Sequence, residues 1–593
     1  MSYQAPIKDM LFVMQELAGI GKITELPGFE DYGLDTAQAV LEESAKFCQD
    51  VIAPLNWEGD IHPSSFSAGE VTTTPGFKEA FAQFAAGGWQ GVIHPPEYGG
   101  QGFPKLIGSA CAEMLHASSL SFALCPMLTD GAIEALLTAA SDELRQKYVP
   151  QLVSGQWTGT MNLTEPQAGS DLAAVRSRAE PQADGTYRIF GTKIFITYGE
   201  HDMAENIVHL VLARLPDAPP GVKGISLFVC PKFLLNANGS LGERNDVHCV
   251  SIEHKLGIKA SPTAVLQFGD HGGAIGELVG EPNRGLEYMF VMMNAARFAV
   301  GMQGISVSDR AYQQALAYAK DRVQSRDLAG SPGPVAIIHH PDVKRMLLTM
   351  KAHTEAARAL AYCTAAISDL AHHADDESVR RENLALYEYL VPIVKGHSTE
   401  LSIELTSLGV QIHGGMGFIE ETGAAQHYRD ARILTIYEGT TAIQANDLLG
   451  RKTLRDGGGV AKALCALIAA TEQDLGARCD PDCEAMRSAL ERGRLALQAT
   501  VDYLVGNGKT SVKPDYAGAV NYLRLAGLVL GGWQMARSLL ASLDKQAEDP
   551  VFHGGKITTA RFYADALLPQ ADALAASVLS AGGTVDRMAV EMF

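Results

Sequence analysis

The sequence lacks the features of a membrane or nucleic-acid protein. No run of about 18 residues is continuously apolar, so we expect no membrane-spanning helix. The 48 Lys and Arg side chains are outnumbered by 68 Asp and Glu, and the resulting net charge of −20 repels a phosphate backbone, so we expect no nucleic-acid partner. The apolar stretch Met10–Met14 is flanked by Asp9 and by Gln15 and Glu16. It therefore predicts an amphipathic helix rather than a signal peptide.

Metal-ligand patterns are also missing. The nine cysteines are scattered, and the only close pair, Cys479 and Cys483, has neither the spacing nor the partner pair of a zinc site. Two pairs of adjacent histidines, at 339–340 and 372–373, point about 100° apart if they lie in helices, so they do not converge on one ion. We therefore expect free thiols, no metal, and a soluble protein of the cytoplasm, a reducing compartment.

Several common catalytic signatures are absent as well. The sequence has no complete phosphate-binding GxxxxGK[ST] loop, no GxGxxG after a strand, no HExxH and no GxSxG. The composition is that of a folded protein with a large hydrophobic core, because 47% of the residues are hydrophobic and 20% are charged. Its 593 residues suggest about four domains at roughly 150 residues each.

The periodicity of apolar residues changes along the chain. A helical period dominates residues 1–157, short β-branched and aromatic runs dominate residues 158–280, and the helical period returns in residues 281–455. After the glycine run at 457–459, residues 460–593 predict a further bundle, with helices expected at 461–476, 484–506, 516–544 and 556–581. The predicted fold class is mainly α with a central β domain.

The first segment with chemical character is Met161–Asp171, at the entry to the β region. Its sequence, MNLTEPQAGSD, offers a glycine with freed backbone amides and small hydroxyl side chains, which suit a polar ligand lying against the chain. The alternative is a turn between helix and strand in which Ser170 or Asp171 is a cap.

The second segment is Lys193–Tyr198. Strand alternation predicts that Phe195 and Thr197 share a face, so that an aromatic ring could stack on a flat heterocycle while the hydroxyl bonds its edge. The alternative is an ordinary half-buried strand.

The third segment combines the glycine cluster Gln411–Gly417 with Ile433–Thr441. Backbone amides of the glycine cluster could wrap a phosphate group. Glu438 lies in an apolar stretch, where desolvation raises a carboxyl pKa and makes the group a stronger base, suited to removing a proton from carbon. The alternative is that Glu438 only begins the following helix, near its positive end.

Together these segments resemble the acyl-CoA dehydrogenase family of flavoproteins, in order and spacing, over about residues 30–450. Further matches are Pro96–Gly102, similar to the family's PEEYGGxG turn, Lys255–Thr263, and the stretch Arg322–Gln324. The resemblance implies an N-terminal helical domain, a middle β-barrel-like domain, a C-terminal four-helix bundle and FAD as cofactor. An additional helical domain would then follow.

The resemblance also implies a role for each matching residue. Contacts to FAD are implied for Leu163, Thr164, Gly169, Ser170, Phe195, Thr197, Arg322, Gln324, Gln411, Gly414, Gly415, Thr440 and Gln444. Those of Arg322, Gln324, Gln411, Gly414 and Gly415 would be made to the FAD of a neighbouring subunit. Contacts to the acyl-CoA substrate are implied for Ser170, Asn294, Arg297 and Gly439.

The activity implied by the family is α,β-dehydrogenation of an acyl-CoA thioester. Glu438 would take the α-proton while a hydride leaves the β-carbon for flavin N5, giving a trans-2-enoyl-CoA. The electron acceptor would be an electron-transfer flavoprotein. Phe195 departs from the family, since many members have tryptophan there, so stacking is kept but the indole donor is lost.

The chain continues about 140 residues beyond the basic family plan. Long members include very-long-chain enzymes and bacterial 3-methylmercaptopropionyl-CoA dehydrogenases, and the opening Tyr3–Phe12 resembles the latter. The expected substrate is thus 3-methylmercaptopropionyl-CoA or a fatty acyl-CoA, and the expected assembly is a homodimer. Two alternatives stay open: an acyl-CoA oxidase that uses oxygen, and a DNA-associated alkylation-response flavoprotein, which the acidic surface disfavours.

Overall fold

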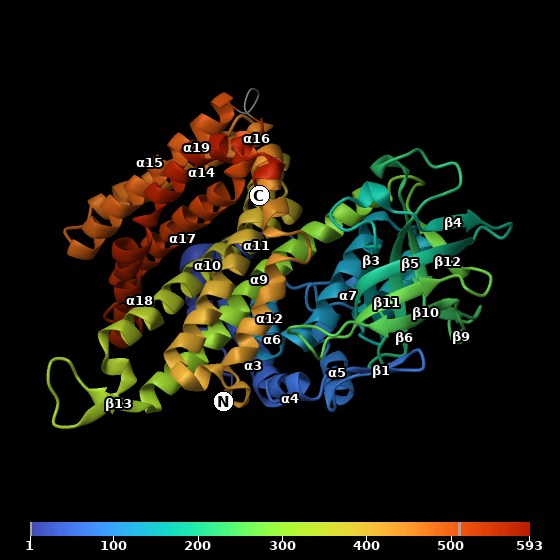
Figure 1. The fold of residues 1–593 in the computed structure, drawn as a ribbon, viewed down its shortest axis with the longest axis horizontal. Coiled ribbons are helices and arrows are strands. Elements are labelled where there is room, and N and C mark those ends of the chain that lie inside the picture. Colours follow the sequence, from blue (N-terminus) through green and yellow to red (C-terminus); the bar gives the residue numbers. More distant parts are fainter. Residues whose placement is uncertain (1–2, 508–511) are drawn as a thin grey trace.

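The computed structural model describes residues 3–507 and 512–593, which run through helices, then strands, then two further groups of helices. In Figure 1 the sheet stands at one end of the molecule, the long helices of residues 285–413 cross the middle, and the last helices cover the opposite side. The architecture confirms the predicted mainly helical fold with a central β domain.

The N-terminal region is built from helices whose apolar residues face inward at threes and fours. In α3, for example, Ala37, Leu41 and Ala45 are buried. The helices are α1 (Ile7–Phe12), α2 (Ile20–Ile23), α3 (Leu34–Phe47), α4 (Leu55–Ile61), α5 (Phe77–Ala86), α6 (Lys105–Ser118), α7 (Leu120–Ala139) and α8 (Asp142–Val153), with π-helical turns at Val13–Ala18 and Cys48–Ile52. A hairpin of β1 (Ser65–Ser67) and β2 (Glu70–Thr72) was not predicted, because strands of three residues are too short to show a period.

Helix α7 is the one described helix that is long and apolar enough to cross a membrane. However, 83% of its most apolar window is buried inside the protein, against α9 and β3. Helix α7 is therefore a core helix.

The β domain is one sheet of eight strands, in the order β10-β11-β5-β12-β7-β6-β3, with β4 paired to β5. Its parallel pair, β3 with β6, is buried along its whole length, as is β7. Strands β6 and β7 therefore read as largely apolar runs, whereas β3 also buries Thr158, Thr160 and Asn162. The strands are β3 (Trp157–Asn162), β4 (Arg178–Pro181), β5 (Tyr187–Thr197), β6 (Asn206–Ala213), β7 (Ser226–Pro231), β10 (Val247–Ile252), β11 (Thr263–Phe268) and β12 (Ala274–Val279), with a separate hairpin of β8 (Phe233–Leu235) and β9 (Leu241–Arg244).

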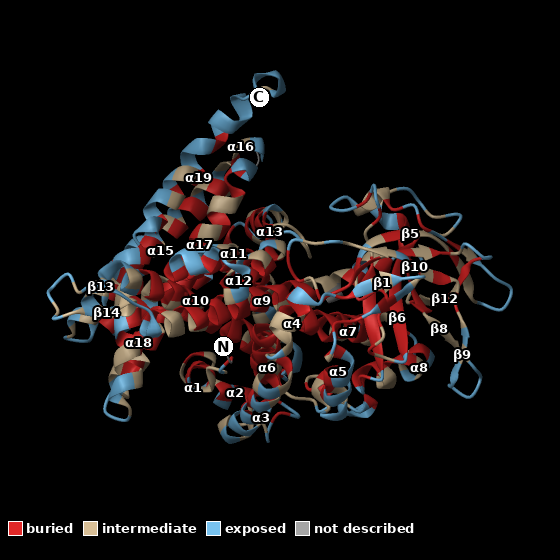
Figure 2. Ribbon diagram, turned by 60° about the horizontal axis from the view of Figure 1, so that its bottom comes forward, coloured by how far each residue is buried: buried red, intermediate tan, exposed pale blue. Residues whose placement is uncertain are grey.

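Three long helices form the centre of the molecule. They are α9 (Gly285–Asp321), α10 (Pro341–His373) and α11 (Glu377–His413), followed by the short helices α12 (Ala424–Ala431) and α13 (Thr441–Asp447). Helices α9 and α11 approach so closely that a Cβ at Gly301 would lie 2.8 Å from the carbonyl oxygen of Val394. The hairpin of β13 (Val323–Arg326) and β14 (Pro334–Ala336) joins α9 to α10. Figure 2 shows that buried residues concentrate along these helices.

The last bundle packs on α10 and α11 mainly through helix α17 (Ala519–Asp544). Its helices are α14 (Gly459–Gly476), α15 (Pro481–Asn507), α16 (Val512–Ala517), α17 (Ala519–Asp544), α18 (Pro550–Phe562) and α19 (Gln570–Arg587). The single helix expected at 556–581 was wrong, because α18 ends in a π-helical turn and Pro569, which has no N–H to donate, stands before α19. The expected helix at 516–544 is likewise divided at Gly518 between α16 and α17.

Candidate active site

The loop after β3 is held to strand β5 by a buried ion pair. Lys193 Nζ lies 2.8 Å from Glu165 Oε1 and 3.1 Å from the carbonyl oxygen of Leu163, to which it donates. The Ile194 N–H donates to the Thr164 carbonyl oxygen at 3.0 Å. The segment Leu163–Thr164, predicted to contact the cofactor, is therefore fixed against the strand that carries Phe195.

The Glu165 carboxylate accepts further hydrogen bonds besides the one from Lys193. The N–H groups of Arg176 and Ser177 and the Ser177 hydroxyl donate to its carboxylate at 2.8, 3.0 and 2.6 Å. Burial alone would raise the pKa of Glu165, but the Lys193 charge and these donors bring it down to about 2. Glu165 therefore holds the loop together as a carboxylate.

The predicted alternation of Phe195 and Thr197 is interrupted. The pairing of β5 with β11 shifts between Lys193 and Ile196, and Phe195 has φ +59°, in the left-handed region. The Phe195 ring is 59% exposed, an unusual state for a phenylalanine, whereas Thr197 is half-buried. The bulge thus presents an apolar ring to solvent beside the loop that follows β3.

Gly169 and Ser170 are exposed on that loop, and nothing lies within 4 Å of a Cβ built at Gly169. Asp171 accepts from the Ala173 N–H at 3.0 Å and begins a 3₁₀ turn, so the predicted alternative of a cap holds for Asp171. An exposed glycine and hydroxyl, with an exposed aromatic ring on the neighbouring strand, form an open surface that a flat ligand could cover.

Glu438 lies in a strained turn rather than in a helix. It has φ +52°, and Gly439 after it has φ +87°, while α13 begins only at Thr441 with Thr440 as its N-cap. Two successive left-handed residues require a glycine at one position and outside support at the other. The alternative that Glu438 merely starts a helix is therefore wrong.

Glu438 is half-buried as a residue, and its carboxyl group lies in a buried, charged environment. Burial raises its pKa above the ordinary 4.5, and the positive charges of Lys395 and Arg297 oppose that rise. Arg297 is buried on α9, with Nη1 3.5 Å from Asp447 Oδ2. Asn294 stands one turn earlier on the same helix and is half-buried. Of the predicted substrate residues, Arg297 and Gly439 are thus close to the base.

Gln444 supports the turn from α13. It is fully buried, and its Nε2 donates to the carbonyl oxygens of Glu438 and Gly439 at 3.2 and 3.3 Å. The Thr440 hydroxyl accepts from the Ile443 N–H at 3.3 Å. The cofactor contacts predicted for Thr440 and Gln444 remain predictions, and in this structure both side chains serve the turn that carries Glu438.

The remaining predicted FAD residues lie at the other end of α9. Arg322, Gln324, Gln411, Gly414 and Gly415 are all exposed. The rings of Tyr318 and His413 stack with centroids 4.4 Å apart, which brings the ends of α9 and α11 together. Gly414 has φ +60° and ψ −139°, a conformation open only to glycine.

Arg297 lies on α9, and Arg322 caps the C-terminal end of the same helix, 25 positions later. At about 1.5 Å per residue this separation is roughly 38 Å. The predicted residues beside Glu438 and those at the C-terminal end of α9 therefore lie far apart within one chain.

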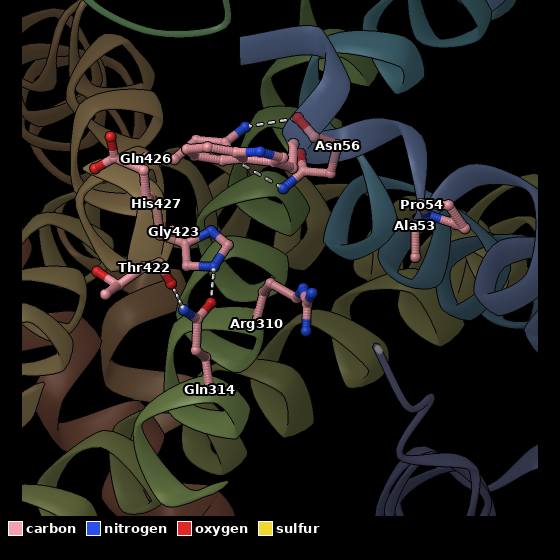
Figure 3. A pocket seen from close by; sticks show the side chains of 11 residues that line it. Ala53, Pro54, Asn56, Arg310, Gln314, Thr422, Gly423, Gln426 and His427 are labelled. Carbon is pink, nitrogen blue, oxygen red and sulfur yellow. Dashed lines mark hydrogen bonds between the residues drawn. The ribbon is translucent and has the colours of Figure 1, made fainter. Parts of the chain in front are cut away.

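A cavity of about 290 Å³ lies between the start of α4, the last third of α9, and α12 with the segment before it (Figure 3). Gln314 Nε2 donates to the Thr422 carbonyl oxygen at 2.5 Å, and its Oε1 lies 2.9 Å from His427 Nε2. The lining residues are Ala53, Pro54, Asn56, Trp57, Arg310, Gln314, Glu421, Thr422, Gly423, Gln426 and His427. None of the predicted site residues lines this cavity.

Sequence reasoning missed two supports of the Glu438 turn. Lys395 on α11 donates to backbone carbonyls of the turn, and the Tyr437 hydroxyl donates to Gln303 Oε1 on α9. Lys395 follows the apolar run Leu390–Val394, so the argument that singled out Glu438, a charge inside an apolar stretch, would have found it. Gln303 carries no such signal.

Models of known domains match almost the whole chain. "Acyl-CoA dehydrogenase, N-terminal domain" matches residues 35–156, the "middle domain" 160–271 and the "C-terminal domain" 283–452. The chain belongs to the acyl-CoA dehydrogenase family. Residues 464–589 match "Acetyl-CoA dehydrogenase C-terminal like".

Full-length relatives of this acyl-CoA dehydrogenase are known. It is 50% identical to the 3-methylmercaptopropionyl-CoA dehydrogenase of Ruegeria pomeroyi over 588 residues, 99% of each chain. It is 36% identical to a butyryl-CoA dehydrogenase of Syntrophomonas wolfei, over 96% of this chain and 95% of the relative. The solved acyl-CoA dehydrogenase of Bacillus anthracis, complexed with FAD, has the same fold, with a TM-score of 0.75 and 21% identity over 94% of this chain and 90% of that one.

The enzyme is an FAD-dependent oxidoreductase of acyl-CoA thioesters. Its residues fit the cofactor at both places where contacts are predicted. The exposed Phe195 ring and the open backbone at Gly169 suit an isoalloxazine ring, and the exposed Gly414–Gly415 backbone suits a pyrophosphate. The predicted recognition, function class and cofactor are thus confirmed.

Proposed function

We propose that this acyl-CoA dehydrogenase oxidises 3-methylmercaptopropionyl-CoA, with Glu438 as the base that removes the α-proton. The observation that carries the substrate is the 50% identity to an enzyme of that name over 99% of both chains, including the last bundle. The observation that carries the base is a carboxyl with a raised pKa on a strained turn beside Arg297. The thioester carbonyl polarises the neighbouring α-C–H bond, and a carboxylate of raised pKa is suited to removing that proton.

In the proposed reaction Glu438 takes the α-proton. Bound FAD supplies the acceptor for the hydride that leaves the β-carbon, and Leu163, Thr164, Gly169, Ser170, Phe195 and Thr197 would hold its ring end. A carbon–carbon double bond forms between the α and β carbons, and the methylthio group stays on the β-carbon. Arg297 would face the substrate from α9, with Asn294 and Gly439 beside the reacting thioester.

We propose a homodimer in which each chain completes the other's cofactor site. The roughly 38 Å between Arg297 and Arg322 supports this, since Arg297 lies beside Glu438 whereas the residues predicted to contact the FAD of a neighbouring subunit lie at the far end of α9. Several exposed apolar side chains are close in sequence to the predicted contacts at the C-terminal end of α9. Such side chains are suited to burial against a second copy of the chain. They are Val323, Leu328, Met416, Phe418 and Ile419.

The electron acceptor we propose is an electron-transfer flavoprotein, and the compartment is the cytoplasm. The nine cysteines, all within the described residues, are free thiols, which supports a reducing environment. Anaerobically reduced enzyme mixed with air separates the proposal from an oxidase: slow reoxidation by oxygen, with fast reoxidation by an electron-transfer flavoprotein, supports the dehydrogenase. Fast reoxidation by oxygen alone would support the oxidase.

A substrate panel tests the substrate. We expect kcat/KM for 3-methylmercaptopropionyl-CoA to exceed that for butyryl-CoA and for longer straight-chain thioesters. Butyryl-CoA is the second candidate, on the strength of the 36% identical full-length relative. A preference for butyryl-CoA or longer chains would overturn the thioether assignment and leave the reaction class standing.

A further inference from the structure

Lys395 lies underneath the turn that carries Glu438. It is fully buried near the middle of α11, next to Val394, where α9 packs closely through Gly301. Its Nζ donates to the carbonyl oxygen of Leu434 at 2.9 Å and to that of Gly439 at 2.6 Å. One ammonium group therefore binds the chain on both sides of Glu438.

These two hydrogen bonds meet a need of the turn. Glu438 keeps φ +52° although it is not a glycine, and such a conformation persists only where its surroundings fix it. Gln444 binds the same turn from α13, and Tyr437 ties it to Gln303 on α9. Lys395 is the only charged side chain among these supports that the described residues provide.

The charges that act on Lys395 come from the turn itself, from α11 and from α9. Burial lowers the pKa of Lys395 to about 7; the Glu438 carboxylate on the turn and Glu400 on α11 oppose this, and Arg297 on α9 adds to it. Arg297 is itself paired with Asp447 on α13. Burial raises the pKa of Glu438, and the charge of Lys395 lowers it more than the charge of Arg297 does. Thus the amine that holds the turn also favours the ionised base.

We propose that Lys395 is a positioning residue for the dehydrogenation: its ammonium group fixes the turn that carries Glu438 and supplies the positive charge that keeps the base ionised. This inference rests on the proposed role of Glu438. It adds a group that does not touch the substrate and acts only through the turn and the field at the carboxylate.

Two substitutions separate the functions of Lys395. Lys395→Gln keeps an amide donor for the carbonyls and removes the charge, and Lys395→Met removes both. In anaerobic stopped flow with the FAD-loaded enzyme, we expect flavin reduction to slow about 10-fold in Lys395→Gln and about 100-fold in Lys395→Met, because a misplaced base loses rate steeply. Lys452→Met, which removes a lysine paired with Glu388 in the same bundle, is the matched control and should leave the rate unchanged.

The pH profile distinguishes this role from a merely structural one. Without the positive charge, the rising acid limb of kcat/KM should move up by about one pH unit in Lys395→Gln. Since Lys395 must be protonated to act, the native profile should also fall as the pH rises through about 7, and this alkaline limb should vanish in both variants. Unchanged limbs in Lys395→Gln, or a native profile without the alkaline limb, would overturn the proposal even if Lys395→Met does not fold.

Glu438→Gln distinguishes failure of the inference from failure of the proposed function. If Glu438→Gln is inactive while both Lys395 variants behave as the native enzyme, only the inference is wrong. If Glu438→Gln turns over normally, the assignment of the base is wrong, and the inference falls with it.

Discussion

Lys193 and Glu165 form an ion pair that is almost completely shielded from solvent, with Nζ 2.8 Å from Oε1. Burial lowers the pKa of Lys193 to about 8, and Glu165 opposes that shift. Both side chains lose hydration on burial, and the attraction between their opposite charges offsets that cost and holds the loop to the strand. Removing one partner strands a buried charge, which is more costly than removing both.

We therefore expect Lys193→Met to destabilise the β domain by about 3–5 kcal/mol and to weaken FAD binding. The double variant Lys193→Met with Glu165→Leu should recover part of the loss. The measurement is the melting temperature together with the release of flavin fluorescence on heating, and Lys223→Met on an exposed turn is the control. Equal melting of the single variant and the native enzyme would contradict the account of this loop.

A second buried network ties the N-terminal segment to the last bundle. Asp9 of α1 accepts from Arg358 Nη1 on α10 at 2.7 Å and from Lys556 Nζ on α18. Asp9→Asn should therefore lower the melting temperature by an amount that corresponds to about 3–5 kcal/mol. Lys8→Met removes the neighbouring surface pair with Asp549 and should cost at most about 1 kcal/mol. Similar melting of the two variants would show that the network does not hold the bundle.

The proposed dimer predicts a coupled loss of assembly and cofactor. Phe418 is 87% exposed on the chain beside the predicted pyrophosphate contacts, so Phe418→Glu should shift the protein toward monomer and lower its FAD content. Val551→Glu, at an equally exposed site on the last bundle, should do neither. Analytical ultracentrifugation and the ratio of flavin to protein absorbance measure both effects. A Phe418→Glu dimer with full FAD content would exclude this face as the interface.

The pH dependence follows from the state of the base. Burial raises the pKa of Glu438 above 4.5, and a base must be unprotonated, so activity is lost as the pH falls through that raised value. We expect the acid limb of kcat/KM to lie clearly above the ordinary glutamate pKa of 4.5. An acid limb at or below that value would mean that Glu438 titrates as a solvated carboxyl.

Much of this architecture could be predicted from sequence, for physical reasons that also explain the misses. The long helices α9, α10 and α11 show a helical period over more than 30 residues each, so local pattern suffices. The break before α19 depends on one proline in an otherwise helical pattern, and the exposure of Phe195 depends on a bulge that pairing with β11 creates. Such features arise from contacts between distant segments.

The site shows the same division. Glu438 could be predicted because an apolar neighbourhood is visible in sequence, and the structure agrees on its raised pKa. Its left-handed backbone, and the contacts that Lys395 and Gln303 make with its turn from two other helices, become visible only when the helices are packed.

The most direct test of the account is the rate of flavin reduction in Glu438→Gln, measured anaerobically with saturating acyl-CoA. We expect the variant to bind FAD with a native visible spectrum and to reduce it about 10²–10⁴-fold more slowly, since a positioned base contributes that much. Flavin reduction at the native rate would contradict the assignment of Glu438 as the base.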